Sequence, residues 1–349
     1  MTVNGGRGGR RPTLEEVAAR AGVGRGTVSR VINGSPRVSD ATRAAVEAAV
    51  AELGYVPNTA ARALAANRTD AIALVVPEPE TRFFAEPYFS DILRGIGSEL
   101  SDTGMQLLLT FAGSDRERER LAQYLAAHRV DGVLLVSVHA DDPLPDLLAQ
   151  WEIPAVISGP RSAAETLTSV DSDNYGGARS AVEHLLARGR HTIAHITGQL
   201  DVYGAQRRAD GHRDALRDAG HPEDRLLVET GDFTEEGGRR AMARLLERRP
   251  GLDAVFAASD VTAAGARQVL REAGRRIPED VALVGYDDSA IARHMDPPLT
   301  SVRQPIEKMG RAMLDLLLTE IADRRLGASR EAERRHVVLP AELVVRASS

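Results

Sequence analysis

Residues 13–68 read TLEEVAARAGVGRGTVSRVINGSPRVSDATRAAVEAAVAELGYVPNTAARALAANR, and this stretch decides how the N-terminal part of the chain folds. Thr13 and Glu16 form a capping box: the hydroxyl can accept from the Glu16 amide, and the carboxylate can bond back. Apolar residues then recur at helical spacing as far as Gly22, where a turn needs a residue that tolerates positive φ. The pattern predicts a short helix followed by a tight turn.

A second helix is predicted from about Arg25 to Asn33, with its apolar residues on one face. That face consists of Val28, Val31 and Ile32. The polar residues that face outward are Arg25, Thr27, Ser29 and Arg30. Two helices joined in this way form a helix-turn-helix, whose second helix enters the major groove of DNA. A third helix ends at Gly54.

The charge of the chain is unevenly distributed. The whole chain carries −6, but residues 1–68 hold ten arginines and five acidic residues, which leaves +5 there and −11 in the rest. A basic head on an acidic body suits contact with DNA through the head alone. Lys308 is the only lysine, so arginine is the default basic residue here and a single arginine is weak evidence of function.

Composition narrows the possible classes further. At 349 residues the chain suits two or three domains. It has no cysteine, hence no disulfide and no thiolate metal site. His191 and His195 are four residues apart on a predicted strand, about 13 Å at the usual rise, so a metal pair is disfavoured. No apolar signal region or membrane-length apolar run occurs, and we expect a cytoplasmic protein without metal or cofactor, with residues 1–11 disordered.

From residue 70 onward, apolar strands alternate with amphipathic helices, which indicates parallel sheets with helices on both faces. The strands predicted are 71–76, 106–110, 132–137, 155–157, 192–197, 226–229, 254–258 and 282–286. A quasi-repeat, VDGVL at 130–134 and LDAVF at 252–256, indicates two similar α/β lobes. In such folds ligands bind at the carboxyl ends of the strands, which here means the cleft between the lobes.

Four segments together carry a resemblance to a known family. They are Thr13–Asn33, Glu52–Ala65, the VGYDD run Val284–Asp288, and PPLTSVRQP from Pro297 to Pro305. In this order they resemble the lactose-repressor (LacI/GalR) family of bacterial transcription regulators. The resemblance implies a helix-turn-helix head, a hinge helix and a two-lobed, periplasmic-binding-protein-like core. The boundaries it suggests are 12–56 for the head, 57–69 for hinge helix and linker, 70–189 with 303–334 for the N-terminal lobe, and 190–302 with 335–349 for the C-terminal lobe.

The resemblance also implies which residues contact DNA. These are Thr13, Gly24, Arg25, Gly26, Thr27, Ser29, Arg30, Asn33, Ser39, Tyr55, Ala63 and Leu64. Arg25 could grip guanine O6 and N7 together, or it could be a solvated surface arginine. Gly26 allows close approach of the backbone but removes a possible base contact. Leu64 matches the wedge that opens a minor-groove base step; the alternative is an ordinary linker leucine.

In the core, family positions that contact the effector fall on Arg208, Phe233 and Asp287, and Phe89 is a similar case. Ser137 and Ser259 are candidates for hydroxyl contacts because each ends a predicted strand. A guanidinium and a carboxylate suit vicinal hydroxyls, and an aromatic ring suits the C–H face of a sugar. Arg208 could instead be structural, and Phe233 could be a core residue. The segment TRFFAEPYF, 81–89, resembles the actinobacterial branch that responds to cellobiose and related β-glucosides, and it could contact a second sugar ring.

These observations predict a homodimeric repressor that binds palindromic operator DNA and releases it when a sugar enters the cleft. A transport-type sugar-binding protein is a rival, but it has no use for the DNA-binding head. An enzyme using Asp287 and Asp288 is another, but adjacent residues on a strand point to opposite faces. A repressor that needs a purine-type corepressor stays open. The tail shows no leucine heptads, so a dimer is favoured over a tetramer.

Overall fold

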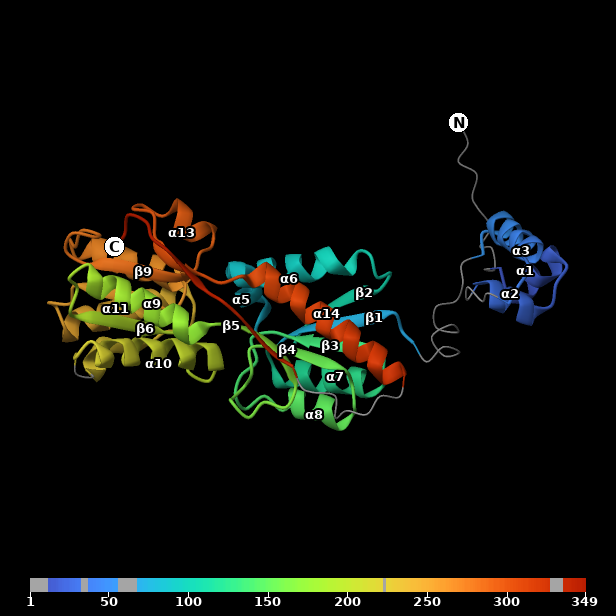
Figure 1. The fold of residues 1–349 in the computed structure, drawn as a ribbon, viewed down its shortest axis with the longest axis horizontal. Helices are drawn as coiled ribbons and strands as arrows, with labels where there is room; N and C mark the ends of the chain where they lie inside the picture. Colours follow the sequence, from blue (N-terminus) through green and yellow to red (C-terminus); the bar gives the residue numbers. More distant parts are fainter. Residues whose placement is uncertain (1–11, 33–36, 56–67, 222–223, 327–334) are drawn as a thin grey trace, which may run out of the picture. The chain divides into compact units, whose positions relative to one another are not determined.

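A computed structural model describes residues 12–32, 37–55, 68–221, 224–326 and 335–349. The chain forms two compact units, one ending at Thr69 and the other beginning at Asp70 (Figure 1). Within the described residues no helix is long and apolar enough to cross a membrane.

The first unit contains three helices: α1 (Leu14–Ala21), α2 (Arg25–Ile32) and α3 (Asp40–Leu53). The predicted capping box is present, with the Glu16 amide donating to Thr13 Oγ1 at 3.3 Å and the Thr13 amide to Glu16 Oε2 at 2.8 Å. Gly22 (φ 67°) and Gly54 (φ 61°) end α1 and α3 in the left-handed conformation. The helix-turn-helix prediction is therefore confirmed.

The N-terminal lobe of the second unit is built on a six-stranded parallel sheet in the order β11-β5-β4-β3-β1-β2. Its strands are β1 (Ala71–Val76), β2 (Gln106–Phe111), β3 (Gly132–Leu135), β4 (Ala155–Ser158), β5 (Thr168–Ser172) and β11 (His336–Leu339). Its helices are α5 (Glu80–Ala85), α6 (Pro87–Leu100), α7 (Asp115–Ala126), α8 (Leu144–Gln150) and α14 (Ile306–Arg325).

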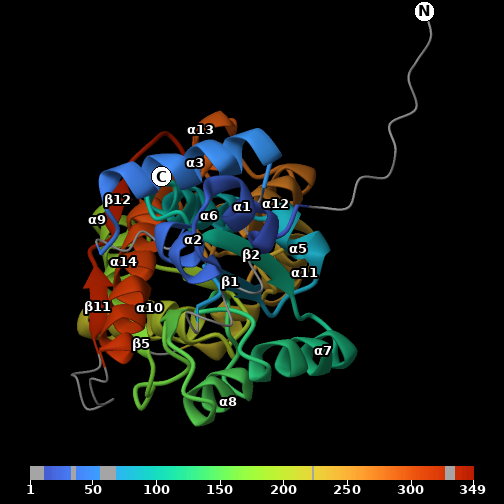
Figure 2. The ribbon, with the colours of Figure 1, turned by 90° about the vertical axis from the view of Figure 1, so that its right-hand side faces the viewer.

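Alternate residues of β1 face opposite sides of this sheet, as the strand period requires. Ile72 and Leu74 pack with α6 and α14, whereas Ala73 and Val75 pack with α7 and α8. The sheet is thus covered by helices on both faces (Figure 2).

The C-terminal lobe repeats the design with the strand order β12-β10-β9-β8-β6-β7, parallel except for β12 against β10. Its strands are β6 (Ile193–Thr197), β7 (Val228–Thr230), β8 (Ala254–Ala257), β9 (Ala282–Asp287), β10 (Thr300–Arg303) and β12 (Glu342–Val344). Its helices are α9 (Asn174–Ala187), α10 (Tyr203–Asp218), the 3-10 turn η1 (Arg225–Leu227), α11 (Glu235–Arg248), α12 (Asp260–Glu272) and α13 (Ala290–His294).

The chain crosses between the lobes at other positions than the sequence suggested. The first crossing lies between β5 and α9, not near residue 189, because the apolar face of α9 packs into the C-terminal core with Phe256. The second follows β10, at 304–305, close to the boundary suggested near residue 302. The third lies at 340–341 rather than 334, because β11 pairs with β5 of the N-terminal lobe. The helical period identifies a buried face but not the lobe that buries it.

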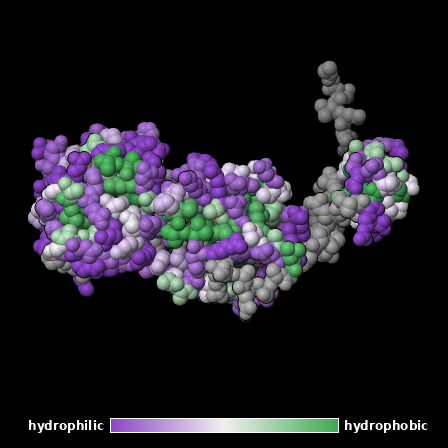
Figure 3. Space-filling view, in the orientation of Figure 1, coloured by the Kyte–Doolittle hydropathy of each residue, from purple (hydrophilic) through white to green (hydrophobic). Residues whose placement is uncertain are grey.

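All eight predicted strands are present, with small shifts at their ends. The short strands β5, β10, β11 and β12 are not among those eight; β5 reads TSVDS, with four hydroxyl or carboxyl side chains among five residues. On the face seen in Figure 3, hydrophilic side chains surround separate hydrophobic areas, and exposed apolar residues include Leu326 and Val338.

Two glycines allow α6 and α14 to approach closely. A Cβ on Gly95 would overlap the backbone carbonyl of Glu307, and a Cβ on Gly310 would overlap that of Ile92. Gly97, two residues along α6, is exposed and has open space where its Cβ would be. The helix pair therefore depends on the missing side chain at one glycine of α6 and not at the other.

Gly95→Ala is expected to destabilise the core by about 1–3 kcal/mol, because the helices must separate to admit a methyl group. Gly97→Ala is the matched control and should stabilise by about 0.5–1 kcal/mol through helix propensity alone. Urea unfolding of the purified variants measures both. Equal effects of the two substitutions would contradict the close packing.

Candidate effector cavity and DNA-contacting face

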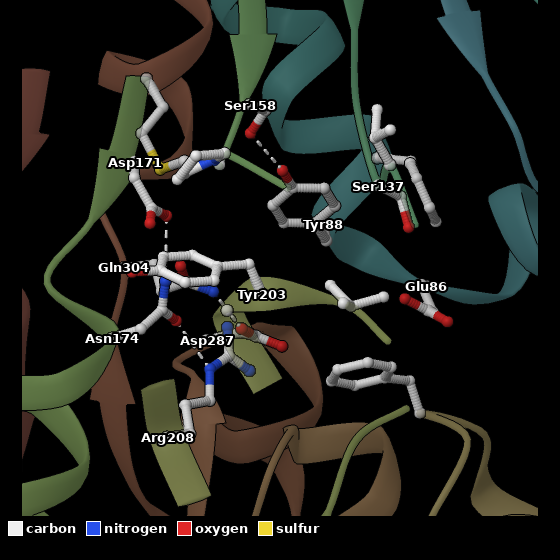
Figure 4. Close-up of a pocket in the computed structure, with 18 of the residues that line it drawn as sticks. Glu86, Tyr88, Ser137, Ser158, Asp171, Asn174, Tyr203, Arg208, Asp287 and Gln304 are labelled. Carbon is white, nitrogen blue, oxygen red and sulfur yellow. Dashed lines mark hydrogen bonds between the residues drawn. The ribbon is translucent and has the colours of Figure 1, made fainter. Parts of the chain in front are cut away.

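A cavity opens between the lobes of the second unit, with about 680 Å³ of empty space that includes some open solvent (Figure 4). Its walls come from loops after the carboxyl ends of β3, β4, β5, β7 and β9, together with α5, α6, α10 and the second crossover. The polar residues lining it are Arg82, Glu86, Tyr88, Ser137, Ser158, Asp171, Asn174, Tyr203, Arg208, Asp287 and Gln304. This is the place where parallel α/β lobes bind ligands.

Arg208 of α10 is the cation of the C-terminal wall and is buried. Its Nε donates to Asn174 Oδ1 at 2.8 Å, and its Nη1 donates to the Ala258 carbonyl. The guanidinium lies 3.8 Å from the centroid of the Tyr286 ring, a cation–π contact. Because these contacts fix its plane, Arg208 presents its remaining edge in one orientation.

Asp287 ends β9 beside this arginine. Its Oδ1 accepts from Gln304 Nε2 at 2.6 Å, and Gln304 Oε1 in turn accepts from Ser172 Oγ at 2.6 Å. Burial raises the pKa of Asp287, and the attraction of Arg208 only partly offsets that rise. Burial, and then the nearby charge of Asp287, raise the pKa of Asp260, which accepts from Ser301 Oγ.

Two further carboxylates line the cavity from the N-terminal lobe. Asp171 accepts from Asn174 Nδ2 at 2.9 Å, so Asn174 links it to Arg208 of the other lobe. Burial raises the pKa of Asp171 to about 6. Glu86 accepts from Arg82 Nε at 2.6 Å, and burial raises its pKa to about 7.

Three residues of the cavity wall have backbone conformations that L-residues rarely adopt. The φ angles are 56° at Ser137, 64° at Phe233 and 103° at Asp287. Such strain gathers at sites where the surrounding structure holds a side chain in position for function. All three residues lie at or just after the end of a strand, so the strain turns their side chains toward the cleft.

The chemistry of this wall suits a ligand with many hydroxyl groups and apolar faces. Carboxylates accept from hydroxyls, Arg208 donates to them, and the rings of Tyr88, Tyr203 and Phe233 offer flat surfaces. No cluster of three metal-binding side chains occurs within the described ranges. His195, one of the two histidines considered as a metal pair, forms a hydrogen bond from Nδ1 to the Phe256 carbonyl. Its ring stacks on that of His212.

Five of the six residues proposed for the effector line this cavity: Phe89, Ser137, Arg208, Phe233 and Asp287. Phe89 is almost fully buried, so it forms the floor of the cavity as part of the N-terminal core. Ser259 is the exception: it caps α12, accepting from the Thr262 amide at 3.1 Å, and is not among the residues that line the cavity.

The sequence reasoning missed several lining residues. Tyr88, Arg82 and Glu86 belong to the segment 81–89, which was expected at the cleft as a whole but not residue by residue. Gln304 lies inside the motif PPLTSVRQP of residues 297–305. Its place in a motif shared with the family is the sequence feature that could have identified it as a cavity residue. Asp171 lies on β5, the strand that the sequence pattern did not reveal.

In the first unit, α2 presents the face expected to read DNA. Arg25, Gly26 and Arg30 are exposed, and Thr27 and Ser29 are half-buried. Arg25 Nη1 forms an ion pair with Glu15 Oε1 at 3.1 Å. Ion pairs at such exposed positions are weak, so Arg25 can leave Glu15 and contact a base or a phosphate instead. Gly24 carries the carbonyl that accepts the first bonds of the helix, from the amides of Thr27 and Val28.

The expected phosphate contacts differ in their local roles. Thr13 and Ser39 are the N-caps of α1 and α3, where backbone amides favour an anion. The Tyr55 ring packs in the core of the head, so only its hydroxyl could contact a phosphate. Asn33, Ala63, Leu64 and the hinge helix lie outside the described residues.

Comparison with known proteins agrees with this geometry. Residues 13–58 match the model for bacterial regulatory proteins of the lacI family, and residues 182–349 match the periplasmic binding protein-like domain. The chain is 53% identical to the HTH-type transcriptional regulator CelR of Thermobifida fusca over 341 residues, 97% of this chain and 98% of the relative.

Two solved structures are similar over 97% of this chain. One is a transcriptional regulator CelR–cellobiose complex, with 50% identity, a TM-score of 0.76 and full coverage of that chain. The other is the lac repressor dimer bound to operator and the anti-inducer ONPF, with 29% identity, a TM-score of 0.83 and 99% coverage of that chain.

Gly198→Ala should displace the Phe233 ring, because a Cβ at Gly198 would overlap it. Binding of a sugar ligand in this cavity, measured by calorimetry, is expected to weaken about tenfold, or about 1.4 kcal/mol. Gly251→Ala, at an exposed glycine with open space around its Cβ, is the control and should leave binding unchanged. Unchanged binding in Gly198→Ala would remove Phe233 from the ligand site.

Asp287→Asn should stabilise the folded chain while weakening ligand binding. A buried carboxyl with a raised pKa contributes most to stability when protonated, and this contribution is lost as pH rises above its ordinary pKa of 3.8. The gain in Tm is therefore expected to be near zero at pH 4 and about 2–4 °C at pH 7. Thermal melting across this range tests it; a difference that does not change with pH would contradict the desolvation argument.

Proposed function

Because the chain belongs to the lacI family of bacterial regulatory proteins, we propose that it is a homodimeric repressor whose operator is released when cellobiose or a related β-glucoside binds between its lobes. The family is one of transcription regulators, so the enzyme alternative falls away. As a protein that acts on operator DNA, it is expected to work in the cytoplasm.

One observation carries the choice of ligand. The cavity combines a fixed guanidinium, three carboxylates and several aromatic rings, and the same fold, at 50% identity, is known as a cellobiose complex. A disaccharide has two rings to contact, and the wall has two groups of side chains. Arg208, Asp287 and Phe233 form one group, and Tyr88 and Glu86 of segment 81–89 form the other.

The dimer and the palindromic operator are supported by the lac repressor relative, which is a dimer on its operator. The N-terminal lobe also exposes large apolar side chains. Phe84 of α5 is 76% exposed and contacts the ring of Phe111 at the end of β2. Leu108, in the middle of β2, is 38% exposed. Such a group of exposed apolar residues suits an interface with a second copy.

Sugar can release DNA only if it prefers the arrangement of the lobes that binds the operator poorly. The preference is reciprocal, so operator DNA must weaken sugar binding by the same factor. A purine-type corepressor would instead strengthen operator binding. The titration described next distinguishes this alternative from induction by a sugar.

The test is fluorescence anisotropy of the protein on DNA from upstream of its own gene, with cellobiose, cello-oligosaccharides, maltose, glucose and hypoxanthine titrated separately. Release by cellobiose or another β-glucoside alone supports the proposal. Tightening by any of these compounds would overturn the assignment as an inducible repressor.

Two variants separate the sites in the same experiment. Arg208→Ala should retain operator affinity and lose the response to sugar. Arg25→Ala should weaken operator binding about tenfold, the loss of one bidentate guanine contact, and retain sugar affinity. A variant that loses both activities would show misfolding instead, which circular dichroism detects.

A further inference from the structure

A group of polar side chains joins the two lobes beside the cavity. His139, in the loop after β3 of the N-terminal lobe, places Nδ1 2.8 Å from Asp201 Oδ2 and Nε2 3.0 Å from Glu78 Oε1. Asp201 follows β6 of the C-terminal lobe, and Glu78 follows β1 of the N-terminal lobe. The Ala140 amide adds a backbone bond to the Asp201 carbonyl at 2.8 Å. One imidazole ring thus spans the gap between the lobes.

The contacts of His139 determine its charge. A neutral imidazole has one N–H, so it cannot donate from both ring nitrogens. Here each ring nitrogen faces a carboxylate oxygen, an arrangement that is favourable only for the imidazolium ion. Consistent with this, the hydrogen bond to Glu78, and then that to Asp201, raise the pKa of His139 to about 9. His139 is therefore a cation held between two anions at neutral pH.

Glu78 connects this bridge to the cavity wall. It is buried, and burial alone would raise its pKa, but the hydrogen bond from His139 and the charge of Arg82 hold the pKa below its ordinary value. The same oxygen, Oε1, accepts from Ser137 Oγ at 2.8 Å and from Arg82 Nη1 at 2.6 Å. Ser137 and Arg82 both line the cavity, whereas His139 does not.

Arg82 makes a second connection between the lobes. Its Nη1 donates to Gln199 Oε1, in the loop after β6, at 2.5 Å. Its guanidinium also lies 5.2 Å from the centroid of the Phe233 ring in the C-terminal lobe. Two cations of the N-terminal lobe therefore hold neighbouring groups of the C-terminal lobe.

We propose that His139, acting through Glu78 and Asp201, is a positioning residue that holds the lobes together and thereby sets the affinity for the effector without contacting it. The inference rests on the proposed effector site between the lobes. Apparent affinity equals intrinsic affinity multiplied by the fraction of molecules with the lobes together. Loss of the bridge lowers that fraction, so it must weaken every ligand of the cavity by the same factor. Loss of a wall contact instead changes the ranking of ligands.

The experiment compares His139→Gln, Asp201→Asn and the double variant with the wild type. His294→Gln, on the exposed face of α13, is the control. Calorimetry measures the affinity for cellobiose and for cellotriose. Each single variant is expected to weaken both sugars by the same factor, about fivefold. The double variant should be no weaker than the weaker single, because both substitutions remove one bridge.

The arrangement of the lobes is measured without sugar. Since the chain has no cysteine, Arg116→Cys on α7 and Arg271→Cys on α12 provide the only two attachment points for spin labels in each chain. Pulsed EPR should show longer distances between the labels in His139→Gln and Asp201→Asn than in the wild type or His294→Gln.

Unchanged distances, or different losses for the two sugars, would overturn the proposal. If no sugar binds even the wild type, the proposed function fails. The distances in the sugar-free protein still decide whether His139 joins the lobes.

Discussion

A buried guanidinium is the constraint around which the effector wall is built. A cation taken out of water must be held by acceptors and anions of good geometry, or the fold loses several kcal/mol. Arg208 obtains acceptors from Asn174 at the start of α9 and from the carbonyl after β8. The attraction of Asp287 at the end of β9 adds to these, although burial costs that carboxylate more than the attraction returns. The ring of Tyr286 covers the face of its guanidinium. These contacts hold α9, α10 and the ends of β8 and β9, which are distant in sequence, in fixed positions at the cleft.

The same wall also carries backbone strain and carboxyl groups whose pKa is raised. Asp287 and Phe233 adopt positive φ, and Asp171, Glu86 and Asp287 all have their pKa raised by burial. A wall optimised for stability alone would avoid both features. Their presence together at the edge of two parallel sheets is what a site that exchanges water for ligand hydroxyls requires. The Asp171–Asn174–Arg208 chain also couples the two lobes, because one amide serves an acid of the first and a cation of the second.

Much of this could be predicted from the sequence, because local patterns determine local structure. The capping box at Thr13, the turn at Gly22 and the buried face of α2 follow from spacing alone, and the apolar strands of both lobes are evident. Strand β5 could not be found, because its hydroxyl and carboxyl residues lack an apolar pattern, and Asp171 was missed with it. The resemblance suggested that α9 belongs to the N-terminal lobe, and the end of a strand suggested Ser259 as a ligand contact. Neither signal shows what a residue packs against: α9 packs into the C-terminal core, and the Ser259 hydroxyl caps α12.

Two opposing electrostatic terms meet at the cleft, and their balance is the physical basis of a switch. Bringing the lobes together removes water from Glu86, Asp171 and Asp287, which opposes closure because their charged forms are disfavoured there. The bridge from Glu78 through His139 to Asp201 favours closure, since it places a cation between two anions. A ligand can donate hydrogen bonds to the carboxylates of both walls at once only when both walls surround it. The ligand therefore interacts differently with the two arrangements, and this difference in affinity is what allows its binding to shift their populations.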